Sequence, residues 1–454
     1  MKYAIVLAAG KGTRMQSNIN KVMHPLLNKP MIGHVVDHLE AIDIKETVVV
    51  VGHESEGIKD YLQDRVQYAT QTEQIGTADA VKKVTQLECK VGSTLVLFGD
   101  GALIQSETLE SIFEAHNGAE LTIVTAVVKN PGRYNRVIRD TQGNVKKIVE
   151  TSKATALEAT SNEINLGVYV FNNELLYKYL PEIDNDMKEE LNIIDLVSIM
   201  RKNGHSIQAI RVEDESEFMG INDRVELHKA NKWLQTRINE RHMLGGVSIL
   251  DMDSVFIGPD VKIEADVTIH PNVHLYGKTT ISEGVEILPG SWLENAEIGD
   301  HTKIDASKIV NSKIGVHTTV GPYAHIREHS DVKDHVRVGN FVELKTTTLG
   351  DHTACAHLSY LGNAKVGKYV NIGCGVVSVN YDGKKKSETI IGDHTFVGSQ
   401  VGLLAPINIG KEVVVAAGSF IQDDVEDGAL AISRPQQVNK KNSGKKYLSE
   451  KGKI

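Results

Sequence analysis

The chain has 454 residues, a formal net charge of −9 at pH 7 and three cysteines. Its length predicts two domains or more, and its acidic balance argues against nucleic acid or an anionic membrane as the main partner. Cys89, Cys355 and Cys374 are odd in number and widely spaced, so they do not suggest a disulfide framework or a zinc site. The apolar run Tyr3–Ala9 is too short for a signal peptide, and no stretch reaches transmembrane length, so we expect a cytoplasmic protein.

Residues 1–222 alternate short apolar runs, which are typical of strands, with helix-like patterns. The strand-like runs are Tyr3–Leu7, Thr47–Val51, Thr94–Phe98, Leu121–Val128 and Ile164–Phe171, and the helix-like patterns include Ile32–Leu39, Ala78–Leu87 and Thr108–His116. This alternation predicts an α/β domain with a mostly parallel sheet covered on both faces. Ligands of such sheets bind beyond the carboxyl ends of the strands, so the turns after the first and third runs are candidate sites.

The first of these turns reads Leu7-Ala8-Ala9-Gly10-Lys11-Gly12-Thr13-Arg14-Met15. It matches neither a P-loop nor a dinucleotide fingerprint. Gly10 and Gly12 let backbone N–H groups close on a phosphate, and Lys11 and Arg14, followed by Lys21, add positive charge. The alternative interpretation is an ordinary tight turn between a strand and a helix.

The second turn, Phe98-Gly99-Asp100, places a carboxylate at a strand end. A carboxylate there suits a hard divalent cation that bridges phosphates. A lone Asp at a strand end is more often a helix cap, but its position in the same crevice as the glycine loop favours the metal.

From Ile249 to Ile421 an aliphatic residue returns at every sixth position. The three runs are Ile257, Ile263, Ile269, Leu275, Ile281, Ile287, Leu293; then Ile314, Val320, Ile326, Val332, Val338, Leu344; then Ile391, Val397, Leu403, Ile409, Val415, Ile421. A period of six predicts a parallel β-helix of triangular section with these aliphatics as its core. Pro259, Pro271, Pro289 and Pro322 each follow such a residue by two positions, where a corner would fall.

Two further segments flank the repeats. Asp223–Met243 reads as one long helix between the α/β domain and the β-helix. The tail from Asn439 to Ile454 carries six lysines against one glutamate, which indicates either a solvated, disordered tail or contact with a phosphate-bearing ligand.

The six-residue repeat is interrupted between Leu344 and Leu361, and again between Ile372 and Ile391. Interruptions of a repeat are where a functional site or an excursion loop is expected. The first interruption holds His357, and Arg327, Glu343 and Lys345 stand just upstream. A histidine beside two cations and a carboxylate at coil-compatible spacing is a candidate general base.

The loop Leu-Ala-Ala-Gly-Lys-Gly-Thr-Arg-Met resembles the signature of sugar-1-phosphate nucleotidyltransferases. With Gln71–Ala78, Gly220–Arg224 and the hexads, the chain is similar from end to end to the bacterial family of bifunctional N-acetylglucosamine-1-phosphate uridyltransferase / glucosamine-1-phosphate acetyltransferases. The resemblance implies three parts: a Rossmann-like α/β uridylyltransferase domain (1–224), a linker helix (225–246), and a left-handed parallel β-helix of hexapeptide repeats with a basic tail (247–454). It also implies Mg²⁺, UTP and acetyl-CoA as cosubstrates, and a homotrimer with shared acetyltransferase sites.

The resemblance also implies the site residues. The catalytic set is Arg14, Lys21, His357 as general base, and Glu343, which orients the imidazole. The set for UTP and the UDP-sugar is Leu7, Ala8, Ala9, Gly10, Lys21, Gln71, Gly76, Thr77, Phe98, Gly99, Asp100, Asn135, Glu150, Asn165 and Asn222, with Asp100 and Asn222 as Mg²⁺ ligands. Arg327, Lys345, Tyr360 and Asn371 would bind the acceptor sugar phosphate, and Cys374, Asn380, Tyr381, Ser399, Ala417 and Arg434 would bind acetyl-CoA.

In the acetyltransferase half the chain departs little from the family pattern, with Cys374 for an alanine and Arg327-Glu328-His329 for Arg-Pro-Gly, and the other departures lie in the N-terminal half. Asn135 stands for a glycine, Leu166 for a threonine, Gly101-Ala102 lacks the usual proline, and Glu189–Asn192 replaces Gly-Glu-Tyr-Tyr. Two alternatives to the bifunctional enzyme stay open. One is a nucleotidyltransferase whose β-helix only oligomerises, and the other is a binding scaffold with a degenerate N-terminal half.

Overall fold

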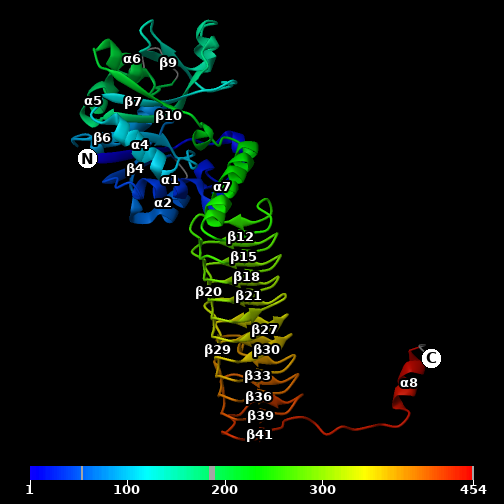
Figure 1. Cartoon of the computed structure of the whole chain (residues 1–454). Coiled ribbons are helices and arrows are strands. Elements are labelled where there is room, and N and C mark those ends of the chain that lie inside the picture. Colours follow the sequence, from blue (N-terminus) through cyan, green and yellow to red (C-terminus); the bar gives the residue numbers. More distant parts are fainter. Residues whose placement is uncertain (53–54, 184–189, 452–454) are drawn as a thin grey trace. The chain divides into compact units, whose positions relative to one another are not determined.

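The computed structural model describes residues 1–52, 55–183 and 190–451 (Figure 1). The chain divides into two compact units, Met1–Leu234 and Gln235–Ile454. Among the described residues, no helix combines the length and apolar character that a membrane span requires.

The first unit is built on a twisted sheet whose main strand order is β11-β7-β10-β6-β1-β4-β5. Its strands are β1 (Lys2–Ala8), β4 (Glu46–Val51), β5 (Gln67–Thr70), β6 (Ser93–Phe98), β7 (Leu121–Val127), β10 (Glu163–Asn172) and β11 (Ile207–Val212), with β8 (Arg136–Arg139) and β9 (Val145–Val149) paired beside β10 and a separate hairpin of β2 (Pro25–Leu26) and β3 (Lys29–Pro30). All five predicted strands are confirmed. The last of them, β10, runs antiparallel to β6 and β7, whereas β1 pairs in parallel with β4 and β6.

Helices cover both faces of this sheet, as predicted. They are α1 (Met31–Glu40), α2 (Glu56–Leu62), α3 (Thr77–Lys82), α4 (Ser106–His116), α5 (Asn173–Tyr179) and α6 (Asp195–Lys202), with short 3₁₀ turns η1 (Thr13–Met15), η2 (Lys21–Met23), η3 (Gln63–Arg65), η4 (Thr85–Leu87), η5 (Thr151–Lys153), η6 (Glu158–Thr160), η7 (Leu180–Glu182) and η8 (Ser216–Phe218). Ile5 of β1 packs in one core with α3, α5 and α6. On the other face Ala8 and Ile32 of α1 meet over Gly99. The helix expected over Ala78–Leu87 is shorter than predicted, because it ends at Lys82 and resumes as η4.

The long helix is α7 (Arg224–Leu244). Asp223 caps its start, since its Oδ1 accepts from the N–H groups of Val225 and Glu226 at 2.9 Å. In the second unit, Gln235 donates to the carbonyl of Val255 at 2.7 Å. The end of the helix is thereby hydrogen-bonded to the first coil of the β-helix.

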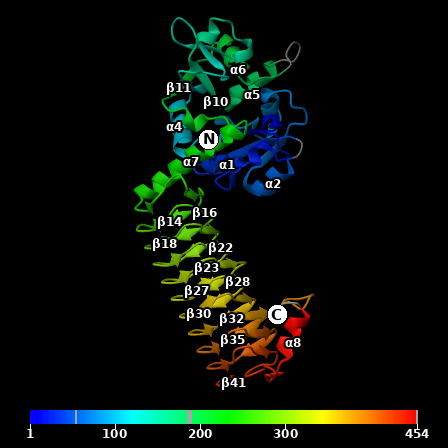
Figure 2. The same cartoon turned by 90° about the vertical axis from the view of Figure 1, so that its right-hand side faces the viewer.

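The second unit is a stack of coils (Figure 2). Its strands form three faces, and each face is a sheet of parallel strands. The first face holds β12 (Ser248–Ile249), β15 (Thr268–Ile269), β18 (Glu286–Ile287), β21 (Lys303–Ile304), β24 (Thr319–Val320), β27 (Arg337–Asn340), β30 (Ala354–His357), β33 (Asn371–Ile372), β36 (Phe396–Val397), β39 (Val414–Val415) and β41 (Leu430–Ala431). The second face holds β13 (Phe256–Ile257), β16 (His274–Tyr276), β19 (Trp292–Glu294), β22 (Lys308–Val310), β25 (His325–Arg327), β28 (Glu343–Lys345), β31 (Tyr360–Gly362), β34 (Val377–Val379), β37 (Gly402–Leu404) and β40 (Phe420–Ile421). The third face holds β14 (Lys262–Ile263), β17 (Thr280–Ile281), β20 (Glu297–Ile298), β23 (Lys313–Ile314), β26 (Asp331–Val332), β29 (Thr348–Leu349), β32 (Ala364–Val366), β35 (Thr389–Ile391) and β38 (Ile407–Ile409).

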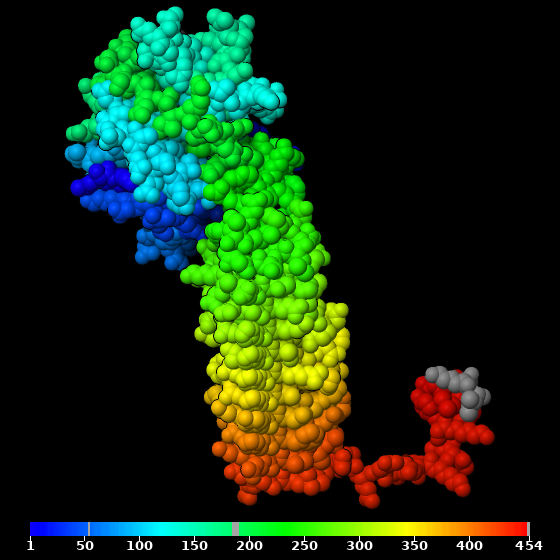
Figure 3. All heavy atoms as spheres, in the orientation of Figure 1, coloured from blue at the N-terminus to red at the C-terminus, as the bar shows by residue number. Residues whose placement is uncertain are grey.

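The six-residue aliphatics form the core of this stack, and in the space-filling view the coils lie in direct contact (Figure 3). Successive coils place them in register, for example Ile269 against Ile287. All members of the three runs are buried except Ile263 in the first coil, which is partly exposed. The arrangement is that of a parallel β-helix, consistent with the left-handed hexapeptide-repeat class.

The two interruptions of the repeat differ in structure. Between Leu344 and Leu361 the coil shortens slightly but continues, with Leu349 and Cys355 taking the buried positions. Between Ile372 and Ile391 the chain leaves the stack after β34 and returns at β35. The second interruption alone is an excursion loop.

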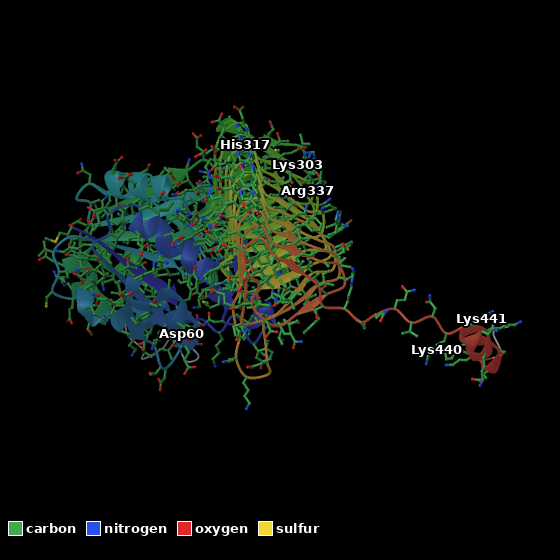
Figure 4. All side chains as sticks on the ribbon, turned by 90° about the horizontal axis from the view of Figure 1, so that it is seen from below. Asp60, Lys303, His317, Arg337, Lys440 and Lys441 are labelled. Carbon is green, nitrogen blue, oxygen red and sulfur yellow. The ribbon has the colours of Figure 1, made fainter. Side chains whose placement is uncertain are left out.

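One corner of the stack, between the third and first faces, carries a column of aromatic rings. His301, His317, His335 and His352 lie in successive coils, each with φ between 50° and 60°. Neighbouring ring centroids are 4.8–5.2 Å apart, and Figure 4 labels His317 at this corner. Left-handed corners favour Asn, Asp and His among the residues with a side chain.

The basic tail does not stay irregular. Residues Ser443–Glu450 form α8, exposed along its length, and Figure 4 labels Lys440 and Lys441 just before it. The expectation of a disordered tail is therefore wrong for this segment.

Candidate active sites

Two adjoining cavities open at the carboxyl ends of β1 and β6, where the sequence predicted a site. The first, of about 330 Å³, is lined among others by Leu7, Ala8, Ala9, Gly10, Lys21, Gln71, Gly76, Thr77, Phe98 and Asp100. The second, of about 380 Å³, is lined among others by Lys21, Thr77, Phe98, Asp100, Asn135, Asn165 and Asn222. Most of the residues expected to bind the nucleotide sugar therefore gather in one crevice.

Four of the expected polar residues form one hydrogen-bonded cluster, and two of them, Lys21 and Asp100, lie in the wall that the two cavities share. Lys21 Nζ donates to Asp100 Oδ2 and, at 2.9 Å, to Asn222 Oδ1. Arg14 Nη2 donates to the same Asn222 oxygen at 3.0 Å. The predicted metal ligands thus face one point from two distant segments. No cluster of three or more His, Cys, Asp or Glu side chains able to hold a metal occurs in the described part of the chain.

Glycines permit the close approach of these segments. A Cβ on Gly12, whose φ is +59°, would lie 2.6 Å from the Lys21 Cβ. A Cβ on Gly76, with φ +128°, would lie 2.3 Å from the carbonyl oxygen of Leu191. Both distances are shorter than any tolerated contact. A side chain at Gly12 would therefore push it away from Lys21, and a side chain at Gly76 would push it away from Leu191.

The second cavity contains a buried amide. Asn165 Nδ2 donates to the Tyr169 hydroxyl at 2.6 Å, and its backbone N–H donates to the Asn135 carbonyl at 2.9 Å. Its Oδ1 is buried without a hydrogen-bond partner among the described residues. Burial raises the pKa of Tyr169 to about 12, so the phenol stays protonated. A buried amide oxygen without a partner is a natural acceptor for a ligand hydroxyl.

Three expected residues lie outside the linings of these two cavities: Arg14, Gly99 and Glu150. Two of them contact residues that line a cavity. Arg14 donates to Asn222 at 3.0 Å, and Glu150 Oε1 accepts from Asn192 Nδ2 at 2.7 Å. Gly99 donates its N–H to the Leu7 carbonyl at 2.9 Å and is structural. Sequence reasoning missed Asn192, which lines both cavities. Glu189, part of the same family departure, lies outside the described residues.

In the β-helix, three of the four residues expected to bind the acceptor sugar phosphate, Arg327, Lys345 and Tyr360, lie on the second face, whereas Asn371 lies on the first. Arg327 lies beside Lys345, and Glu343 beside Tyr360, in consecutive coils. Arg327 donates to Glu343 at 2.6 Å, and this hydrogen bond raises the pKa of the guanidinium. Glu328, not predicted, accepts from Arg327 at 2.6 Å and pairs with Lys345 at 3.2 Å.

His357 ends β30 and is exposed. Its Nδ1 lies 3.1 Å from Asn340 Oδ1, directly opposite it in the neighbouring coil. Since an amide oxygen only accepts, Nδ1 carries the hydrogen of this bond, and Nε2 is the nitrogen left for a substrate. Within the described chain Asn340 holds the ring and Glu343 binds Arg327, so the role of Glu343 in orienting this imidazole stays a prediction.

The residues expected to bind acetyl-CoA continue below His357 along the corner between the first and second faces. Backbone hydrogen bonds join Gly375 to Leu358, Gln400 to Cys374, and Gly418 to Ser399. His357, Cys374, Ser399 and Ala417 therefore occupy the same corner position in successive coils. Arg434 closes the column, because it donates to the Ala417 carbonyl at 2.8 Å.

The remaining expected residues lie apart from this column. Asn380, which is buried, donates to Asn363 at 2.7 Å at the start of the excursion loop, and Tyr381 is exposed on that loop. Asn371 is exposed on β33. In the part of the chain that the structure describes, no hydrogen bond or ion pair joins His357 to Arg327, Lys345 or Tyr360.

Comparisons with known proteins agree with both halves. The nucleotidyl transferase family matches residues 3–235, and a family described as the hexapeptide repeat of succinyl-transferase matches residues 388–422. Bifunctional protein GlmU of an Exiguobacterium species is 44% identical over 449 residues, 98% of this chain and 100% of that protein. The GlmU proteins of Listeria monocytogenes (43% identical; 97% of each chain) and Shouchella clausii (44% identical; 98% of this chain and 99% of that protein) are similar to the same extent.

The crevice and the stacked coils define a transferase with two sites, a nucleotidyltransferase joined to a hexapeptide-repeat acyltransferase. At this identity over almost its whole length, the chain belongs to the family of the bifunctional protein GlmU. It is a bifunctional enzyme of UDP-N-acetylglucosamine biosynthesis, with uridyltransferase and acetyltransferase activities, as the sequence predicted.

Proposed function

We propose that each reaction is carried out by the residues assigned above. The β-helix corner acetylates glucosamine-1-phosphate with acetyl-CoA, and the sheet crevice transfers uridylyl from UTP to the resulting N-acetylglucosamine-1-phosphate. The observation that carries the proposal is the hydrogen-bonded cluster of Arg14, Lys21, Asp100 and Asn222, in which Lys21 and Asp100 form a wall shared by the two adjoining cavities. Such a wall is where a nucleoside triphosphate and a sugar phosphate would meet.

In uridylyl transfer a phosphate oxygen of the sugar attacks the α-phosphorus of UTP in line, and pyrophosphate leaves. Lys21 and Arg14 offset the charge of the triphosphate, while Gln71, Gly76 and Thr77 hold the uridine. Asn165 and Glu150 accept from sugar hydroxyls. The protein contributes placement and charge neutralisation.

Asp100 and Asn222 fit a Mg²⁺ ion, because a carboxylate oxygen and an amide oxygen converge on one cation, the Lys21 ammonium. Mg²⁺ is usually held by one or two carboxylates together with substrate phosphates and water, so two protein oxygens suffice. When bound there, the ion supplies charge neutralisation for the phosphates.

In acetyl transfer the glucosamine nitrogen attacks the thioester carbonyl of acetyl-CoA. His357 Nε2 takes the proton of the amine, the C–S bond breaks, and the departing coenzyme A thiolate takes that proton from His357 and leaves as the thiol. Arg327 and Lys345 bind the sugar phosphate, with Glu343 holding Arg327. The column of Cys374, Ser399 and Ala417 with Arg434 binds coenzyme A, and Tyr360, Asn371, Asn380 and Tyr381 complete the site.

A homotrimer with acetyltransferase sites shared between neighbours, and a cytoplasmic location, belong to the same proposal. Among the described residues, the Arg327–Lys345 set makes no hydrogen bond or ion pair with His357, which supports a site completed by a second copy. Sedimentation of the pure protein would test it, with a mass three times that of the chain expected.

The test of the function is to incubate the pure protein with glucosamine-1-phosphate, acetyl-CoA, UTP and Mg²⁺. Thiol release and pyrophosphate release are followed separately. Both are expected. A purely structural β-helix would release no thiol, and a degenerate N-terminal half would release no pyrophosphate.

A further inference from the structure

Asn192 lies where the two cavities of the crevice meet. It lines both of them, together with Lys21, Thr77, Phe98 and Asp100. Its Nδ2 donates to Glu150 Oε1 at 2.7 Å, and its Oδ1 accepts from the Thr77 hydroxyl at 3.5 Å. One side-chain amide therefore links Thr77, which lines both cavities, to the Glu150 carboxylate.

The backbone around Asn192 is hydrogen-bonded to the Gln71–Ala78 segment. Leu191 donates to the Ile75 carbonyl at 2.7 Å and accepts from the Ala78 N–H at 2.8 Å. The Ile193 N–H donates to the Thr77 hydroxyl at 3.0 Å. These three bonds fix the Asn192 backbone relative to the uridine-binding residues, so its side chain has a defined reach toward Glu150.

Glu150 depends on this contact for its orientation. Its Oε1 receives both the Asn192 amide and the Lys153 ammonium, the latter at 2.9 Å. The Lys153 side chain is 66% exposed, whereas that of Glu150 is 25% exposed. Exposed ion pairs contribute little to positioning, so the half-buried Asn192 amide is the stronger constraint. Among the described contacts, Oε2 of Glu150 is left for a ligand hydroxyl.

We infer that Asn192 is a positioning residue for uridylyl transfer. Its amide holds the Glu150 carboxylate toward a hydroxyl-bearing sugar phosphate, in register with the nucleotide that Thr77 contacts. The inference rests on the proposed function of the crevice. It assigns Asn192 to recognition of the sugar, not to binding of UTP.

The experiment compares Asn192→Ala and Asn192→Asp with wild type. The aspartate keeps the shape of the side chain but replaces the donor with an oxygen that faces the Glu150 carboxylate. We expect both variants to raise KM for N-acetylglucosamine-1-phosphate by about tenfold or more, the range for a lost hydrogen bond to a charged group. The UTP dissociation constant from calorimetry, the melting temperature and thiol release should change little. Asn203→Ala, on an exposed asparagine outside both cavities, is the matched control.

A double-mutant cycle separates positioning from general packing. In a Glu150→Ala background, Asn192→Ala should raise the sugar KM by less than about twofold, because the group it positions is gone. Equal effects in both backgrounds would overturn the inference, and so would an unchanged sugar KM in Asn192→Ala. A rise of the UTP dissociation constant in step with a lower melting temperature would also overturn it, by showing a packing role. If wild type itself releases no pyrophosphate, the proposed function fails before Asn192 is considered.

Discussion

Replacing Asn340 with alanine removes the acceptor that holds the ring of His357. The hydrogen bond is 3.1 Å long and exposed, and a typical hydrogen bond has a net value of about 0.5–1.5 kcal/mol. If this free energy is lost from the transition state, kcat for acetyl transfer falls by about two- to twelvefold. We expect unchanged KM values for both substrates of that reaction and unchanged uridylyl transfer.

The matched comparison is Glu343→Gln, which removes the charge paired with Arg327 at 2.6 Å. Because Arg327 is assigned to the sugar phosphate, this variant should change KM for glucosamine-1-phosphate and spare kcat. Both variants are assayed by thiol release over a range of sugar phosphate concentrations. Full kcat in Asn340→Ala, with a lowered kcat and unchanged KM in Glu343→Gln, would return the orienting role to Glu343.

Three further predictions concern separate parts of the chain. In a Cys89→Ser background, a thiol-directed reagent at Cys374 should block acetyl transfer and acetyl-CoA should protect; equal inactivation rates with and without acetyl-CoA would remove Cys374 from that site. Asn135→Gly should lower KM for N-acetylglucosamine-1-phosphate with kcat little changed, and an unchanged KM would mark Asn135 as a neutral replacement. Burial lowers the pKa of His242 from 6.5 to about 4. Between these two values the unfolded chain binds a proton that the folded chain does not. The resulting contribution to the free energy of unfolding is full above pH 6.5 and is lost as the pH falls toward 4, by about 2 kcal/mol at pH 5. The free energy of unfolding, measured with urea, should depend less on pH in His242→Gln than in wild type or in His228→Gln, an exposed control on the same helix. Equal pH dependence in all three proteins would refute the effect.

The sequence predicted the core of the β-helix almost completely, because in hexads the side-chain position follows directly from the spacing. Ile263 is the exception. It lies in the first complete coil, where an inward position is covered from one side only.

Contacts between coils were harder to predict, because the coil length varies. Asn340 and His357 are 17 positions apart and lie opposite each other, whereas Glu343, closer in sequence, belongs to the next face. Counting a regular coil of about eighteen residues back from His357 reaches Gly339 instead of Asn340. Asn192 gave no such signal, since it sits in a stretch that departs from the family pattern and its partners, Thr77 and Glu150, are distant in sequence.

Two independent sites carry out the two reactions. The most direct measurement follows thiol release and pyrophosphate release on the same preparations of His357→Ala and Asp100→Ala, with preformed N-acetylglucosamine-1-phosphate supplied for the second reaction. His357→Ala should lower acetyl transfer by about a hundredfold or more, the usual contribution of a general base, and leave uridylyl transfer intact. Asp100→Ala should abolish pyrophosphate release, because a Mg²⁺ ligand is lost, while thiol release continues. Parallel losses of both activities in either variant, or full pyrophosphate release by Asp100→Ala, would contradict the account.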